Sequence, residues 1–172
     1  MSIHFLAPDL SRWDQVSADA LALSFFADER PLRGAAGLAD WRLCARISRL
    51  LRAGKLSGRE GETLLLPPAG QRLSFSRVVL FGMGDSRQWS EQRFRAGVQR
   101  IRDVLHRARV SRFALQLPGR ATGLMTPRRA LEIWLEGCDP FDLNGNKDDV
   151  IFIETPSGQK EMAELVRVRP GM

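Results

Sequence analysis

Short apolar runs alternate with longer amphipathic stretches along this chain. Each short run is dominated by residues that favour strands and ends near a turn-forming residue, which predicts a β-strand. The predicted strands are Ser2–Ala7, Ala18–Phe26, Glu62–Leu66, Phe75–Phe81, Phe113–Leu117 and Val150–Glu154. The first of them is expected at a sheet edge, because it is short and Pro8 ends it.

The amphipathic stretches predict helices. The first helix is expected from Gly34 to Gly54, since its apolar residues recur on one face at about 100° per residue. Ser90 is a suitable N-cap for a second helix, and Thr126 followed by Pro127 begins a third. A terminal helix is expected from Ser157 to Leu165.

The order of these elements predicts the fold class. Apolar strands that alternate with helices are typical of a parallel sheet covered on both faces. Adjacent strands without an intervening helix indicate some antiparallel pairing. We therefore expect an α/β fold with a mixed, mostly parallel sheet of about six strands and helices on both faces. A single domain is expected over residues 1–166, with a frayed tail at 167–172.

Composition excludes several classes of protein. The chain has 172 residues, of which 44% are hydrophobic and 27% charged, so it is neither disordered nor collagen-like. Its two cysteines, Cys44 and Cys138, lack the spacing of zinc ligands and are expected in the core. Only two histidines argue against a catalytic centre that needs several of them. The four tryptophans are expected to pack in the core or at its rim.

The N-terminal segment has no basic start followed by a long apolar run, and no stretch approaches the roughly 20 apolar residues of a membrane span. A cytoplasmic protein without membrane contact is therefore expected. The carboxylate pair Asp148 and Asp149 follows a loop rich in glycine and asparagine, so it is interpreted as solvated rather than as a metal site. No metal and no cofactor are expected.

The net charge of +6 has two interpretations. Arginine accounts for 23 of the 26 basic residues, which indicates either a polyanion-binding surface or a coding bias without function. Two predicted helices carry the candidate phosphate-binding residues. They are Arg42, Arg46 and Arg49 on the first helix and Arg93, Arg100 and Arg107 on the second. No exposed aromatic residues are interleaved with them, which disfavours stacking on single-stranded nucleic acid.

A glycine-containing turn is the candidate for a small ligand. Gly82, Gly84 and Asp85 lie where a strong predicted strand ends and a helix follows. Glycines at such a place allow backbone N–H groups to approach a phosphate. The third glycine of a dinucleotide fingerprint is missing, so a tight turn that needs a positive φ is the alternative interpretation.

The run from Asp19 to Pro118 resembles the N-terminal domain of the cytosolic leucyl aminopeptidase family. The segments that carry the resemblance are ALALSFFADERPLRGAAGLAD, ISRLLRAGKLSGREGETLLLP, RVVLFGMGD and the strand FALQLP. The resemblance implies a macro-domain-like α/β fold. It also implies that the metal ligands and the NTDAEGR motif belong to a separate catalytic domain, and neither is found in this sequence.

The resemblance therefore implies a domain without catalysis of its own, which regulates or contacts a partner protein or associates with itself. Two alternatives stay open. Macro domains as a class bind ADP-ribose in loops at the carboxyl ends of strands, so the turn at Gly82 is a candidate for ADP-ribose or a nucleotide. Some members of the aminopeptidase family bind DNA, so the two arginine groups are candidates for nucleic acid.

Overall fold

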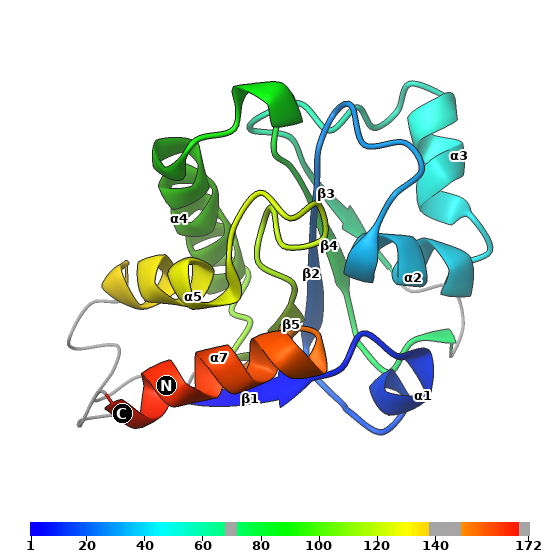
Figure 1. Cartoon of the computed structure of the whole chain (residues 1–172). Coiled ribbons are helices and arrows are strands. Elements are labelled where there is room, and N and C mark those ends of the chain that lie inside the picture. The colour runs from blue at the N-terminus through cyan, green and yellow to red at the C-terminus, as the bar shows by residue number, and fades with distance from the viewer. Residues whose placement is uncertain (68–71, 138–148, 169–172) are drawn as a thin grey trace.

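A computed structural model describes residues 1–67, 72–137 and 149–168. Within these residues, six strands form one sheet in the order β1-β6-β5-β2-β4-β3 (Figure 1). The strands are β1 (Ser2–Leu6), β2 (Ala20–Phe25), β3 (Thr63–Leu66), β4 (Val78–Gly82), β5 (Arg112–Leu115) and β6 (Asp149–Ile153). All neighbours are parallel except β3 and β4, which are antiparallel. The mixed, mostly parallel α/β fold is confirmed, and β1 lies at an edge as predicted.

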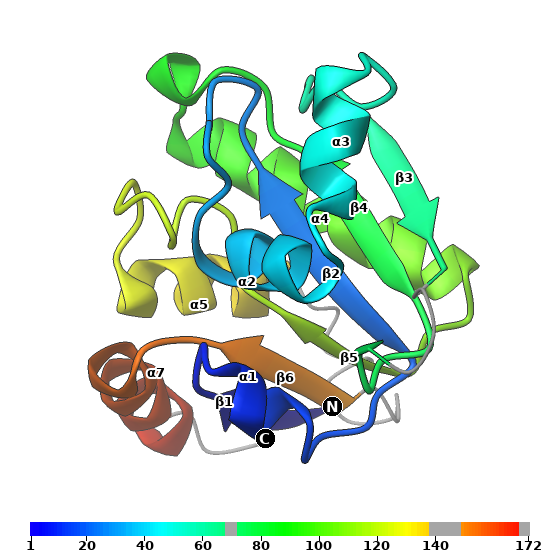
Figure 2. The same ribbon diagram turned by 90° about the vertical axis from the view of Figure 1, so that its right-hand side faces the viewer.

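Helices cover both faces of the sheet. On one face lie α1 (Leu10–Trp13), α2 (Gly34–Arg42) and α3 (Arg46–Arg52), which face the viewer in Figure 2. The other face carries α4 (Glu91–Arg107), α5 (Pro127–Glu136) and α7 (Pro156–Val168). A single turn of 3-10 helix, η2 (Ser86–Gln88), precedes α4.

The alternation of side chains along the strands divides the core into two clusters. In β2, Ala20 and Ala22 join the cluster beneath α4, α5 and α7, whereas Leu21 and Leu23 join the cluster beneath α1, α2 and α3. Both clusters are made of buried apolar side chains, so the central strands are apolar at most positions.

One predicted helix is two helices. The expected helix from Gly34 to Gly54 is interrupted because Cys44 and Ala45 have left-handed backbone, with φ of 54° and 59°. The buried carboxylate of Asp40 stabilises the break, since it accepts hydrogen bonds from the backbone N–H groups of Ile47 (2.7 Å) and Ser48 (3.0 Å) at the start of α3. The helical periodicity of the sequence did not reveal the break, because both halves bury apolar residues against the same sheet.

The prediction that the cysteines are buried is wrong for Cys44, which is exposed in this turn, while Cys138 lies outside the described residues. Trp41 departs from the expected core or rim packing, since it is 72% exposed. Asp149 does not lie in a loop but begins β6, and His4 Nε2 approaches its carboxylate to 2.9 Å. Asp148 is among the residues that the structure does not describe.

Helix termini are mostly as predicted. The side chains of Ser90 and Thr126 accept hydrogen bonds from the first turns of α4 and α5. The terminal helix begins before Ser157, because Thr155 Oγ1 accepts from Gly158 N at 3.3 Å. It continues to Val168, past the expected domain end at residue 166. None of the helices described is both long and apolar enough to cross a membrane.

Candidate functional site

The carboxyl ends of the parallel strands meet at one edge of the sheet, where ligands commonly bind in folds of this class. After β2, the buried carboxylate of Glu29 accepts hydrogen bonds from Phe26 N (3.2 Å) and Arg33 N (2.8 Å). Burial raises the pKa of Glu29, although these hydrogen bonds act in the opposite direction. The Glu29 carboxylate therefore stabilises the conformation of the loop that follows β2.

The N-terminus of α2, at the same edge, is also occupied by the protein. Gln116, which follows β5, accepts a hydrogen bond from Ala35 N at 2.9 Å. A Cβ atom on Gly34 would lie only 2.2 Å from Gln116 Oε1 and 2.6 Å from the Cβ of Ala121. The positive end of this helix therefore faces a protein amide at a distance that leaves no room for a phosphate.

A buried ion pair closes the next part of the edge. Arg120, in the loop after β5, donates to both carboxylate oxygens of Glu154 at the end of β6, at 2.6 and 3.0 Å. Arg120 also donates to the carbonyl of Met125, and Glu154 accepts from Thr155 N at 2.8 Å. The charges of Arg120 and Glu154 therefore neutralise each other.

The glycine turn after β4 uses its amide protons within the protein. Gly82 N donates to Glu62 O (2.9 Å), Met83 N to Phe25 O (3.0 Å) and Gly84 N to Gly58 O (2.9 Å). These are the N–H groups that the phosphate interpretation assigns to a ligand. Gly84 has a φ of 79°, which is the backbone conformation that the alternative interpretation requires.

Asp85 completes the turn and is likewise engaged. Its carboxylate pairs with Arg87 at 2.6 Å, and this contact lowers the pKa of Asp85 to about 2. The same carboxylate accepts a hydrogen bond from Arg87 N at 2.9 Å, so it caps η2.

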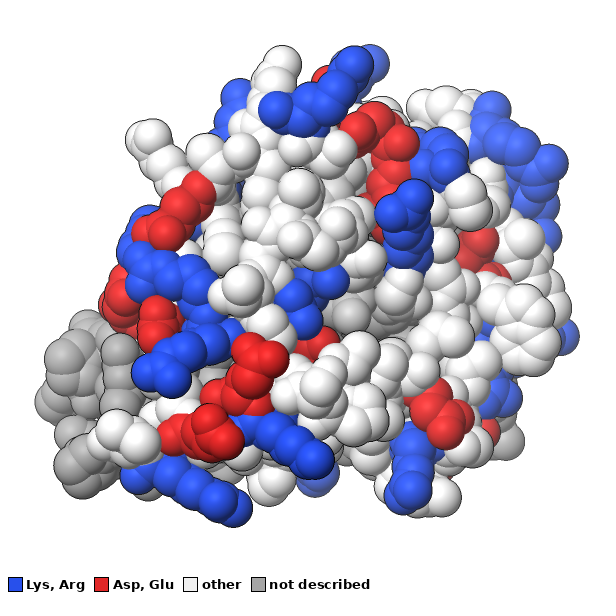
Figure 3. Space-filling model, viewed as in Figure 1, with Lys and Arg blue, Asp and Glu red and all other residues white. Residues whose placement is uncertain are grey.

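The prediction that the first arginine group lies on one helix is wrong, because the break at Ala45 separates its members. Arg42 belongs to α2 and pairs with Asp14 at 2.7 Å. Arg46 and Arg49 belong to α3 and donate to the carbonyl groups of Pro67 (2.9 Å) and Cys44. On the face drawn in Figure 3, positive side chains gather over α3, whereas elsewhere they are interspersed with negative ones.

The second arginine group shares α4 with acidic partners. Arg95 pairs with Glu91 at 3.0 Å and with Glu136 of α5 at 2.6 Å. Arg107 donates from Nε to the carbonyl of Asp103 at 3.2 Å. The ion pairs of Arg95 neutralise part of the positive charge that the sequence places on this helix.

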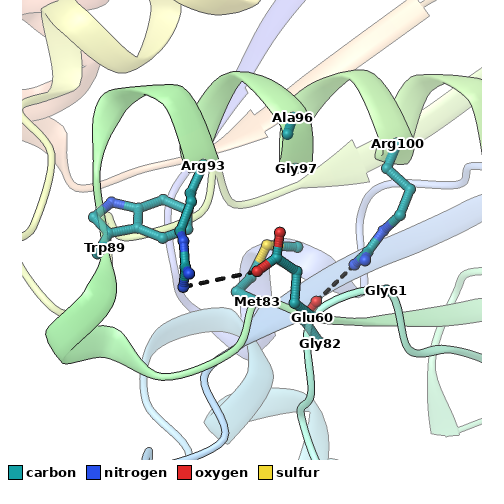
Figure 4. Close-up of a pocket in the computed structure, with 9 residues that line it drawn as sticks. All are labelled: Glu60, Gly61, Gly82, Met83, Trp89, Arg93, Ala96, Gly97 and Arg100. Atoms are coloured by element: carbon teal, nitrogen blue, oxygen red, sulfur yellow. Dashed lines mark hydrogen bonds and ion pairs between the residues drawn. The ribbon is translucent and has the colours of Figure 1, made fainter.

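A pocket of about 280 Å³ brings two sets of candidate residues together (Figure 4). We call it the α4 pocket; it is lined by Glu60, Gly61, Gly82, Met83, Trp89, Arg93, Ala96, Gly97 and Arg100. Gly82 comes from the ligand candidates, and Arg93 and Arg100 come from the polyanion candidates. The two arginines are two helical turns apart on one face of α4, which is why both reach the pocket.

Two arginines of different character line the α4 pocket. Arg100 donates to Gly82 O at 2.6 Å and lies over the ring of Phe81 at 5.9 Å. Its burial lowers its pKa from the ordinary arginine value. Arg93 instead lies 3.7 Å from the carboxylate of Glu60. No sequence pattern indicated Glu60 as a member of this site, because its place depends on the pairing of β3 with β4.

A second concavity, of about 730 Å³, lies on the opposite side of the sheet. We call it the Trp41 hollow; it is lined by Pro31, Leu32, Gly37, Asp40, Trp41, Arg42, Cys44, Ala45, Ser48 and Arg72. Arg72 Nη1 lies 3.0 Å from the sulfur of Cys44. Nothing in the periodicity indicated this surface, which exists because the chain turns between α2 and α3.

Across residues 1–67, 72–137 and 149–168, no three side chains among His, Cys, Asp and Glu come together as metal ligands would.

Sequence comparison decides the family. The profile described as "Cytosol aminopeptidase family, N-terminal domain" matches residues 22–143. The chain belongs to the cytosol aminopeptidase family. A probable cytosol aminopeptidase from Halorhodospira halophila (strain DSM 244 / SL1) is 36% identical over 92 residues, which cover 53% of this chain and 18% of that protein. This aminopeptidase-family domain thus spans about a fifth of the length of its curated relative.

Solved structures share the fold. A mutant of tomato leucine aminopeptidase aligns with a TM-score of 0.61 and 15% identity, over 95% of this chain and 35% of that one. The macro domain of ganglioside induced differentiation associated protein 2 aligns at 0.72 and 12% identity, over 99% and 86%. A Trypanosoma brucei macrodomain in complex with ADP aligns at 0.69 and 15% identity, over 96% and 69%. The aminopeptidase-family domain therefore has the macro-domain-like fold that the resemblance implied.

Proposed function

We propose that this domain is a non-catalytic accessory module that binds a partner protein through the Trp41 hollow. The observation that carries the proposal is the indole of Trp41, which is 72% exposed beside a concavity of about 730 Å³. Tryptophan is among the residues that contribute most to binding energy at protein interfaces, because one side chain buries a large rigid area.

Two observations support the accessory role: the family profile that matches, and the lack of a group of convergent carboxylates among the described residues. The matched profile is that of the N-terminal domain of the family, and it extends over residues 22–143. Hydrolysis assisted by two metal ions needs several convergent carboxylates, and the described residues contain no such group. The name of the relative, a cytosol aminopeptidase, supports a cytoplasmic location for this domain.

The charge of the Trp41 hollow favours an acidic segment of the partner that carries one apolar side chain. Arg42 and Arg72 line the hollow, and its carboxylate, Asp40, is buried and holds the start of α3. Among the described residues, Arg72 makes no ion pair with a carboxylate. An apolar side chain would pack on Trp41, and neighbouring acidic groups would meet Arg72.

The proposal is tested by titrating the purified chain with a synthetic peptide in which one leucine is flanked by aspartate and glutamate. We expect binding that is lost when lysine replaces the acidic residues. We also expect Trp41→Ala and Arg72→Gln each to weaken binding about tenfold or more, measured by calorimetry. Leu65→Ala is the matched control, because Leu65 is 58% exposed on β3, outside the hollow.

Three results would contradict the proposal. A dimer that Trp41→Ala dissociates, seen by sedimentation, would replace the acidic partner by a second copy of this chain. DNA binding that weakens steeply with salt and is lost in Arg72→Gln would assign the surface to nucleic acid. Metal-dependent hydrolysis of leucine anilide by the chain alone would overturn the non-catalytic role.

A further inference from the structure

We infer that the α4 pocket binds a small organic phosphate, with the phosphate held by Arg93 and Arg100 and the organic part against Met83, Ala96 and Gly97. The site lies on the opposite side of the sheet from the Trp41 hollow, so it is independent of the proposed partner surface. It also differs from the phosphate site considered at the backbone of the Gly82 turn, whose amide protons are used within the protein.

The cationic wall of the pocket is pre-organised. The Arg100 guanidinium is fixed by Gly82 O at 2.6 Å and by the Phe81 ring. Its Nε atom is buried and has no hydrogen-bond partner within the described part of the chain. A partly buried guanidinium with unused donor capacity gains more from an anion than an exposed one does, because little side-chain entropy is left to lose.

The position between the arginines already accommodates an anion. The Glu60 carboxylate points into the pocket toward Arg93, at 3.7 Å, which is a loose ion pair (Figure 4). Its side chain is 56% exposed, so it can turn into solvent when a ligand enters. A phosphate carries more charge than a carboxylate and matches the planar donors of guanidinium groups. We therefore expect it to displace Glu60.

The floor of the pocket is apolar and depends on small residues. Gly97 has no side chain, and a Cβ atom there would lie 3.1 Å from the Met83 sulfur. Ala96 likewise leaves space beside Met83 and the rim residue Trp89. A volume of about 280 Å³ suits one small molecule rather than a polymer. Arg95 of α4 pairs with Glu91 of the same helix and with Glu136 of α5. These ion pairs interrupt the positive charge, so no continuous positive track is left for a nucleic acid.

Calorimetry with adenosine monophosphate, ribose 5-phosphate, inorganic phosphate and adenosine tests the inference. We expect both organic phosphates to bind, inorganic phosphate to bind at least about tenfold more weakly, and adenosine not to bind, because the phosphate supplies the attraction and the organic part supplies the packing. Equal affinity for inorganic phosphate would overturn the inference in favour of a simple anion site. Binding of adenosine, or binding of none of the four, would also overturn it.

Three variants connect binding to the pocket. Arg93→Gln is expected to weaken adenosine monophosphate about tenfold, and Glu60→Gln to strengthen it several-fold by removing the competing carboxylate. Arg107→Gln is the control, since it removes one charge from the same helix outside the pocket. Equal weakening by Arg93→Gln and Arg107→Gln, or weakening by Glu60→Gln, would refute the assignment; thermal melts verify that each variant folds.

Discussion

Among individual residues, Gly82 shows how close backbone approach excludes a side chain. Its φ lies outside the left-handed region, yet a Cβ atom there would lie 2.1 Å from Arg59 O and 2.6 Å from Gly58 C. The turn that precedes β3 passes directly over the end of β4 at this point. Gly82 is thus required for the two segments to meet, and their meeting forms one wall of the α4 pocket.

We expect Gly82→Ala to lower the free energy of unfolding by about 2 kcal/mol, because rigid backbone atoms must move to admit one methyl group. Gly54→Ala is the control: Gly54 has a φ of 66° and no atom within 4 Å of the position that a Cβ would take, so only backbone strain of about 1 kcal/mol is expected. Urea unfolding measures both. A loss in Gly82→Ala no larger than the loss in Gly54→Ala would contradict a rigid contact between position 82 and Arg59.

Among the secondary-structure elements, the break between α2 and α3 decides where the arginines of this region point. One continuous helix would place Arg42, Arg46 and Arg49 on one face. The left-handed residues Cys44 and Ala45 redirect the chain instead, and Asp40 holds the new helix start. The break therefore separates the first predicted polyanion face and opens the Trp41 hollow.

Ala45→Gly tests the break. Glycine in a helix interior costs about 1 kcal/mol relative to alanine, whereas at a left-handed position it relieves strain. Since Ala45 has a φ of 59°, we expect the free energy of unfolding to stay the same or to rise by up to about 1 kcal/mol. Ala96→Gly, at an exposed position inside α4, should lower it by about 1 kcal/mol. A similar loss in Ala45→Gly would contradict the break.

At the scale of the whole molecule, arginines form ion pairs with glutamates of helices that are far apart in sequence. Arg129 of α5 pairs with Glu91 of α4 at 2.6 Å, and Arg95 of α4 pairs with Glu136 of α5 at 2.6 Å. Arg129 and Arg95 together lower the pKa of Glu91 to about 2. The arginine excess therefore contributes to the contact between two helices as well as to the surface.

This network predicts a pH dependence of stability. Because the folded-state pKa of Glu91 is below its ordinary value of 4.5, its ionised form stabilises the fold above that pH, and the effect is lost as the pH falls toward about 2. We expect wild type to be more stable than Glu91→Gln at pH 7 and the two to converge near pH 2, as measured by urea unfolding. Glu161→Gln, exposed on α7, serves as the control. A difference that persists at the lowest pH would contradict the role of ionised Glu91.

The type and approximate bounds of most elements follow from the sequence alone. Strands and helices have different periods of burial, and these periods are local properties that a single segment displays. The N-caps Ser90 and Thr126 were predictable for the same reason, since a cap depends on atoms within one turn. The short α1 and η2 were not predicted, because they contain too few residues to show a period.

The strand order, the break at Ala45 and the convergence of Glu60, Gly82 and Arg93 on one pocket emerge only in the folded chain. The same is true of the amides of the Gly82 turn, which are bonded to carbonyl groups of the β2 and β3 regions. Such contacts join segments far apart along the chain. Because their partners are selected by the shared burial of two apolar cores, no single segment carries that information.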